Sequence, residues 1–267
     1  HYATSGEFIT TIELSVNIEM GKFTFEGGDD NWFSSFFSGA QDFIGANEID
    51  QVGYNLNEHY PIDLKRAFYR EEQVKQLYNV IYHVENTPIV LVGPEGVGKH
   101  SLIHEVVFRY MASVEDKNMP AIEYERVWAI DPTRIIAGMS VVGMWQKRFE
   151  AILGFVKDRL SEFKKTKNQT DKILFDNPVA LLRIGKSSQN SMTLSDVLKP
   201  YLESRSLQVI MVASNEEWKI VQEKDRRFAD LFQVIRVAEP KPDIAMRMVL
   251  EYRKQLELTN DCMITVP

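Results

Sequence analysis

Hydrophobic residues follow two alternating patterns from about residue 62 onward. Five short apolar runs, at 88–92, 126–130, 172–176, 207–213 and 232–237, have the length typical of buried strands. Between them, hydrophobic residues recur at intervals of three and four, which predicts amphipathic helices; one such set is Leu102, Ile103, Val106, Val107, Tyr110 and Met111. Strands that alternate with helices are typical of α/β folds, so we expect a five-stranded parallel sheet sandwiched by helices.

The two ends of the chain differ from this middle part. Apolar and polar residues alternate at 8–16, and with a second run at 22–25 they predict a β-hairpin. The aromatic cluster that follows forms either a packed subdomain or a face that docks a partner or a membrane surface: Trp32, Phe33, Phe36, Phe37 and Phe43. After Pro240 and Pro242, residues 244–258 predict a final amphipathic helix.

These patterns divide the chain into three parts. Residues 1–61 form an extension of unknown role, residues 62–240 a large α/β subdomain, and residues 241–267 the beginning of a second subdomain. The first residue is His1 rather than Met, and the sequence stops just after the strand-like run 262–266. We therefore expect a fragment of a longer protein.

Composition and charge narrow the class of protein. The 267 residues are 44% hydrophobic and 26% charged, which is typical of a soluble globular protein. The formal net charge of −7 argues against a nucleic-acid partner, and we interpret Lys164, Lys165 and Lys167 as a solvated loop. Cys262 is the only cysteine, which favours a reducing compartment such as the cytoplasm. No apolar run approaches the roughly 20 residues that span a bilayer, so this fragment gives no indication of a membrane.

The strongest local motif is a glycine-rich loop between the first apolar run and the first long helix. It reads Gly93-Pro94-Glu95-Gly96-Val97-Gly98-Lys99-His100, which satisfies GxxxxGK but lacks the Ser or Thr that normally follows. Backbone N–H groups in such a loop wrap a phosphate, and Lys99 would reach the β- and γ-phosphates. The alternative is a glycine-rich turn with a solvent-facing lysine.

A second motif, which is acidic, supports the phosphate site. Asp176 ends the apolar run 172–176, where P-loop proteins hold Mg²⁺ through water. The alternative is an aspartate that caps the following turn. Together, the two motifs favour a nucleotide site.

With these motifs in hand, residues 62–267 resemble the first AAA+ module of Clp-type unfoldases, the ring ATPases of protein disaggregation and regulated proteolysis. The resemblance extends over about three quarters of the chain, and residues 1–61 have no part in it. Beyond the loop it is carried by short matches spread along the chain: Arg70-Glu71-Glu72, Ile136-Ala137-Gly138, Val197-Leu198-Lys199-Pro200, Ala213-Ser214-Asn215, Phe232-Gln233 and Glu239-Pro240.

The resemblance implies a function and its parts. It implies a P-loop AAA+ fold with only the start of the helical lid, ATP or ADP with Mg²⁺ as ligands, a ring of subunits that we expect to be a hexamer, and a protein substrate or a protease as partner. Ala67 and Phe68 match the apolar adenine wall of the family, and Asn215, or failing that Ser214, matches its polar sensor residue.

Departures from the family pattern fall on the residues of hydrolysis and on the pore loop that grips the substrate. His100 replaces the hydroxyl residue that coordinates Mg²⁺, and Ser101 comes one residue late and about 100° further round the helix. Asn177 replaces the glutamate that activates water. Asp230-Leu231 replaces the arginine finger pair, with Arg226 and Arg227 about one turn earlier, and Ser140-Val141-Val142-Gly143 replaces the aromatic pore loop. Trp145 is either a displaced pore aromatic or a core residue.

Three functional hypotheses follow. The first is a degenerate AAA+ module that binds ATP or ADP with impaired hydrolysis. The second is a slow but genuine ATPase that drives protein unfolding, and the third is a non-enzymatic scaffold with a relic P-loop. The histidines His59, His83 and His104 have no zinc-ligand spacing, and we interpret them as ordinary structural residues.

Overall fold

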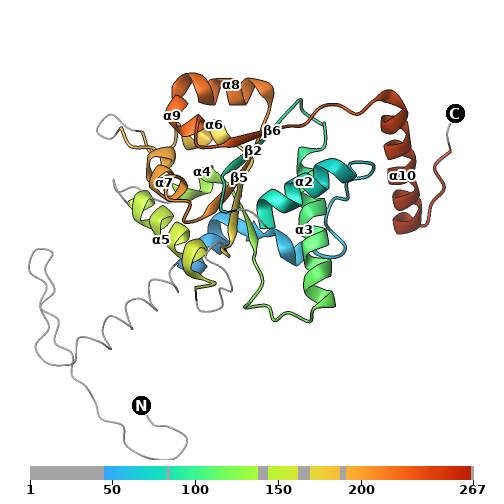
Figure 1. Ribbon diagram of the computed structural model, residues 1–267, viewed down its shortest axis with the longest axis horizontal. Coiled ribbons are helices and arrows are strands. Elements are labelled where there is room, and N and C mark those ends of the chain that lie inside the picture. Colours follow the sequence, from blue (N-terminus) through green and yellow to red (C-terminus); the bar gives the residue numbers. More distant parts are fainter. Residues whose placement is uncertain (1–44, 83–84, 138–143, 162–168, 187–190, 266–267) are drawn as a thin grey trace, which may run out of the picture. The chain divides into compact units, whose positions relative to one another are not determined.

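A six-stranded sheet forms the centre of the computed structural model, which describes residues 45–82, 85–137, 144–161, 169–186 and 191–265 (Figure 1). Its strands are β1 (Gly53–Asn55), β2 (Ile89–Val92), β3 (Val127–Ile130), β4 (Lys172–Phe175), β5 (Gln208–Ala213) and β6 (Gln233–Arg236). The order across the sheet is β1-β3-β4-β5-β2-β6. The five strands from β2 to β6 are parallel, and β1 pairs antiparallel with β3.

Helices cover both faces of the sheet. The long ones are α2 (Glu71–Tyr82), α3 (Lys99–Asp116), α5 (Met144–Asp158), α7 (Leu194–Glu203), α8 (Asn215–Lys224) and α10 (Pro242–Asn260). The short ones are η1 (Leu56–His59), α4 (Pro132–Ile135), α6 (Pro178–Leu181) and α9 (Arg226–Ala229). Figure 1 shows α2 and α3 on one side of the sheet and α5 and α7 on the other.

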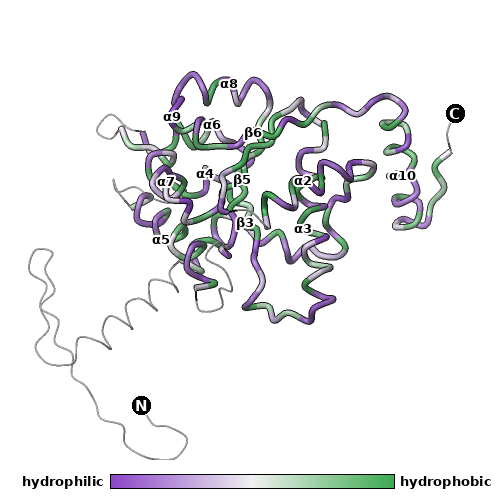
Figure 2. The backbone as a smooth tube through the Cα atoms, viewed as in Figure 1, coloured by the Kyte–Doolittle hydropathy of each residue, from purple (hydrophilic) through white to green (hydrophobic). Residues whose placement is uncertain are grey.

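The alternation of side chains along each strand creates two separate hydrophobic cores. Along β2, Val90 and Val92 join the core that contains α5 and α7, whereas Ile89 and Leu91 join the core that contains α2 and α3. All four side chains are buried because helices cover both faces. The central strands are therefore mostly apolar in sequence, which is visible in their hydrophobic colouring in Figure 2.

The five predicted parallel strands are confirmed, with ends that differ by about one residue. The sixth strand, β1, was not predicted, because three residues of mixed polarity at a sheet edge carry no periodic signal. It comes from the predicted extension: residues 45–61 form an α-helical segment (45–52), β1 and η1, and belong to the same compact unit as the rest of 40–267.

Several predicted features lie outside the described residues. They are the hairpin at 8–16 and 22–25, the aromatic cluster at 32–43, the pore loop at 140–143 and the lysines at 164–167. The predicted final helix is present as α10, none of whose residues is buried. In the part of the chain that the structure describes, no helix combines the length and the hydropathy needed to cross a membrane.

Candidate functional site

The glycine-rich loop joins the carboxyl end of β2 to the start of α3. Gly93 lies so close to β6 that a Cβ atom there would be 2.2 Å from the carbonyl oxygen of Val237. Gly96 (φ 72°) and Gly98 (φ 93°) adopt left-handed conformations that L side chains rarely reach, and a Cβ at either position would meet open space. The loop is therefore open, and no side chain caps the N-terminus of α3.

Lys99 is the first residue of α3 and lies against this loop. Its Nζ donates to the carbonyl oxygens of Gly93 and Pro94, both at 2.7 Å, and the residue is only 8% exposed. Burial lowers the pKa of the Lys99 ammonium, and the carboxylates of Glu217 and Glu95 oppose that shift. The alternative that Lys99 faces solvent is therefore wrong, because its side chain is buried against the loop.

A cavity of about 430 Å³ opens over the loop. It brings together the loop, the end of β4 and the end of β5, which meet at the carboxyl edge of the sheet where α/β proteins bind ligands. Its lining carries the cations Lys65 and Lys99 and the carboxylates Glu95, Asp176 and Glu217, and it is completed by Gly96, Val97, Gly98, His100, Ser101, Val212, Ala213 and Ser214.

Two residues of this lining, His100 and Asp176, are hydrogen-bonded to each other. The Nε2–H group of His100, in the first turn of α3, donates to Oδ1 of Asp176, which follows β4, at 2.8 Å. The two side chains are 44% and 57% exposed. One oxygen of the predicted magnesium-binding carboxylate therefore already accepts a hydrogen bond from the residue that replaces the usual hydroxyl.

Asn177 has a structural partner next to this pair. Its Oδ1 accepts a hydrogen bond from the backbone N–H of Ala180 at 3.0 Å, so it is the N-cap of α6, and Pro178 follows at the first helical position. Asp176 was the sequence-based candidate for the cap of the following turn. In the structure, the neighbouring Asn177 caps it.

A second cavity, of about 930 Å³, adjoins the first and shares Lys65, Ser101 and the residues 95–98 with it. One wall is formed by residues 62–68 and Arg70, which include Ala67 and Phe68. The opposite wall is formed by Ala245, Met248, Val249 and Tyr252 of α10. The structure thus brings the predicted adenine wall next to the glycine-rich loop.

Two residues of α3 hold that wall in place. Glu105, only 2% exposed, accepts hydrogen bonds from Arg66 at 2.6 and 3.2 Å and from the backbone N–H of Ala67 at 3.3 Å. His104 accepts one from the backbone N–H of Lys65 at 3.1 Å through Nδ1. Burial lowers the pKa of His104 to about 4, so it is neutral at pH 7. Sequence reasoning interpreted His104 only as a structural residue and missed Glu105, although a glutamate between the apolar Ile103 and Val106 of a helix was a usable signal.

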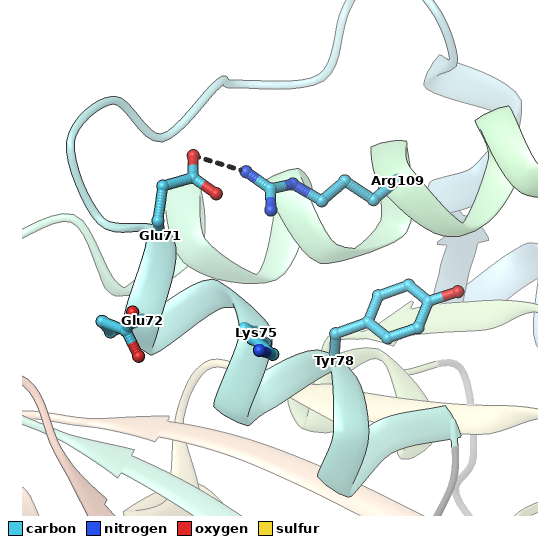
Figure 3. Close-up of a pocket in the computed structure, with 5 residues that line it drawn as sticks. All are labelled: Glu71, Glu72, Lys75, Tyr78 and Arg109. Carbon is cyan, nitrogen blue, oxygen red and sulfur yellow. Dashed lines mark hydrogen bonds and ion pairs between the residues drawn. The ribbon is translucent and has the colours of Figure 1, made fainter.

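The same network reaches α2. Arg109, one turn after Glu105, donates to Glu105 at 3.0 Å and to Glu71 at 2.8 Å. Figure 3 shows the Arg109 guanidinium reaching from α3 to Glu71 at the start of α2, beside a groove that Lys75 and Tyr78 also line. Helix α2 and the segment 65–67 are therefore both fixed to the helix that carries the loop.

Of the remaining predicted residues that the structure describes, only Ser214 lines the smaller cavity. Ser214, which lines it, is the N-cap of α8 in a capping box with Glu217, whereas Asn215 is exposed. Trp145 is 7% exposed and lies in a hydrophobic core, as the core alternative predicted. Arg226 is 87% exposed and pairs with Asp230 at 3.8 Å.

Comparison with known proteins gives a consistent set of relatives. No family model matches the chain. The chain is 26% identical to the chaperone protein ClpB of Malacoplasma penetrans over 223 residues, which cover 81% of this chain and 30% of that protein. It is 28% identical to ClpB of Rickettsia bellii over 191 residues, which cover 71% of this chain and 21% of that protein.

Solved structures agree in fold. S. cerevisiae Hsp104 in complex with casein has a TM-score of 0.64 at 23% identity and covers 82% of this chain and 35% of that one. The S. cerevisiae Hsp104–ADP complex has a TM-score of 0.61 at 22% identity and covers 81% and 29%. These comparisons confirm the resemblance to Clp-type AAA+ modules and the P-loop AAA+ fold. The chain spans 20% to 30% of the length of the ClpB relatives that it matches.

Proposed function

We propose that this chain is the nucleotide-binding AAA+ module of a Clp-like ATP-dependent protein unfoldase, and that it binds ATP or ADP with impaired hydrolysis. The observation that carries the proposal is the open loop before α3, where left-handed Gly96 and Gly98 and the ammonium group of Lys99 line a cavity of about 430 Å³. Backbone N–H groups at a helix start, with a lysine beside them, are a common binding site for polyphosphates.

In this proposal the nucleotide spans both cavities. The polyphosphate occupies the smaller one, where Lys99 exchanges the carbonyl oxygens of Gly93 and Pro94 for phosphate oxygens. The adenosine occupies the larger one, between Ala67 and Phe68 on one side and α10 on the other. Glu105 and His104 act as positioning residues, because they fix the segment 65–67 to the helix that starts at the loop.

Slow hydrolysis follows from the groups that stand in the catalytic positions. A general base contributes roughly 10² to 10⁴ in rate, but Asn177 has no basic group and its amide oxygen caps α6. An arginine finger contributes on the order of 10³ to 10⁵, and Asp230 and Leu231 stand in its place. We therefore expect the nucleotide to act as a structural ligand.

The assembly is proposed from the relatives. The similarity to ClpB chaperones, and to Hsp104 in complexes with ADP and with casein, supports a place in a ring of AAA+ subunits. We expect a hexamer whose partner is a protein substrate or a protease. Turnover in the full-length assembly distinguishes this function from a slow genuine ATPase: a robust rate that Lys99→Ala abolishes would favour the ATPase.

The direct test is a titration with a fluorescent ATP analogue. The wild-type chain should bind it saturably, and Lys99→Ala should weaken binding at least about tenfold, because a charge-assisted hydrogen bond is worth ~1.5–3 kcal/mol. Lys219→Ala is the matched control, because Lys219 is 76% exposed on α8 and should leave binding unchanged. Absence of saturable binding up to millimolar analogue would favour the scaffold with a relic loop.

A further inference from the structure

Magnesium does not fit the residues that stand at its usual place in this loop. Mg²⁺ requires oxygen ligands in near-octahedral geometry, and a P-loop normally supplies one hydroxyl and one carboxylate that acts through water. Here the hydroxyl position holds His100, whose imidazole is a poor ligand for a hard cation.

Ser101 does not restore the missing hydroxyl. It is one residue further along α3, about 100° round the helix from His100. Ser101 lines both cavities. Ala67 and Phe68 line only the larger one, and His100 and Asp176 line only the smaller one. Ser101 therefore lies at the boundary of the two cavities, and the hydrogen-bond partner of the carboxylate is the imidazole.

We propose that the His100–Asp176 pair takes the place of the divalent cation, so that this module binds a nucleotide polyphosphate without Mg²⁺. The inference rests on the proposed function and specifies that the nucleotide binds without a magnesium ion. Its basis is the hydrogen bond of 2.8 Å from Nε2–H of His100 to Oδ1 of Asp176. The imidazole N–H group engages the carboxylate that would hold a magnesium ion in a P-loop of the usual kind.

Two lysines, Lys65 and Lys99, and three carboxylates, Glu95, Asp176 and Glu217, line this cavity, and hydrogen bonds engage two of the carboxylates. A cation in this position normally separates the carboxylate from the phosphates, and the imidazole now shields one oxygen of Asp176. Glu217 is engaged as well, since it accepts a hydrogen bond from the backbone N–H of Ser214 at 2.7 Å. Lys65 and Lys99 line the same cavity and supply positive charge directly.

The test compares binding of a fluorescent ATP analogue in excess Mg²⁺ and in excess EDTA. The wild-type chain should bind with the same affinity, within about twofold, in both buffers. His100→Thr restores the hydroxyl and frees Asp176, so it should bind at least about tenfold more tightly with Mg²⁺ than with EDTA, a difference of ~1.4 kcal/mol. The double variant His100→Thr/Asp176→Asn should lose that preference, because it lacks the carboxylate.

A second readout does not depend on affinity. The imidazole NMR signals of His100 in the nucleotide-bound wild type should stay in the same position when Mg²⁺ is added. Both positions are about half exposed, so the variants should fold, which circular dichroism checks. A wild type that loses tenfold or more of its affinity in EDTA would overturn the inference but leave the proposed function standing. Absence of saturable binding in both buffers would overturn both.

Discussion

At the scale of single residues, His104 makes the stability of the module depend on pH. Burial lowers its pKa from 6.5 to about 4, and the neighbouring His100, Lys65 and His59 add to that shift while Asp176 opposes it. Between these two pH values the unfolded chain binds more protons than the folded chain, so stability is full above about pH 6.5 and falls as the pH decreases toward 4. After allowance for solvent screening, the loss is on the order of 1 kcal/mol.

Urea unfolding at about pH 7 and about pH 5 measures this loss. In His104→Asn the side-chain oxygen can still accept the hydrogen bond from the backbone N–H of Lys65, but it does not titrate. The variant should therefore lose less stability than the wild type over the same interval. Equal losses in the two proteins would show that other groups cause the dependence.

Residue identities at the site were predictable, but their pairings were not. Lys99 and Asp176 were assigned to the phosphate site because each belongs to a motif of fixed spacing, and both line the cavity over the loop. The hydrogen bond between His100 and Asp176 joins residues 76 positions apart, and Glu105 acts on a segment 38 positions away. Such contacts depend on how the helices pack on the sheet, which no local pattern encodes.

At the scale of elements, the junction between β2 and β6 depends on the absence of a side chain at Gly93. A Cβ at this position would be 2.2 Å from the carbonyl oxygen of Val237, so Gly93→Ala must separate the ends of the two strands. We expect a loss of stability of ~1–3 kcal/mol, because overpacking against backbone cannot relax through a side-chain rotation. The urea midpoint measures it.

Gly154→Ala is the matched control for Gly93→Ala. Gly154 lies inside α5, and a Cβ there would meet no atom within 4 Å. Alanine should therefore stabilise the protein by roughly 0.5–1 kcal/mol, because glycine loses more backbone entropy in a helix. The close approach of β2 and β6 would be contradicted if Gly93→Ala were as stable as the wild type. It would also be contradicted if Gly93→Ala and Gly154→Ala changed the free energy of unfolding by the same amount.

The elements themselves were largely predictable because burial on both faces leaves a clear pattern. Each central strand is covered on two sides, so its residues are mostly apolar, and β2 and β5 are buried throughout. The edge strand β1 has no such pattern, since only part of it is covered. Its pairing with β3 comes from tertiary contacts, and sequence reasoning therefore assigned these residues to an extension.

At the scale of the whole molecule, the larger cavity lies between α10 and the segment 62–70 of the α/β unit. None of the residues of α10 is buried, and Val249 and Tyr252 are 63% and 58% exposed although both line the larger cavity. A helix with so little buried surface should open locally at low free-energy cost. A nucleotide between it and residues 62–70 would bury part of that wall and should slow the opening.

Hydrogen exchange of the wild-type chain with and without ADP measures this coupling. The amides of α10 should exchange more slowly with ADP, and the slowing should exceed that in α5, which packs in the core on the other face of the sheet and does not line either cavity. Lys99→Ala should remove the effect at the same ADP concentration. A ligand that only raised global stability by mass action would slow α5 and α10 alike, and that result would show that α10 is not a wall of the nucleotide site.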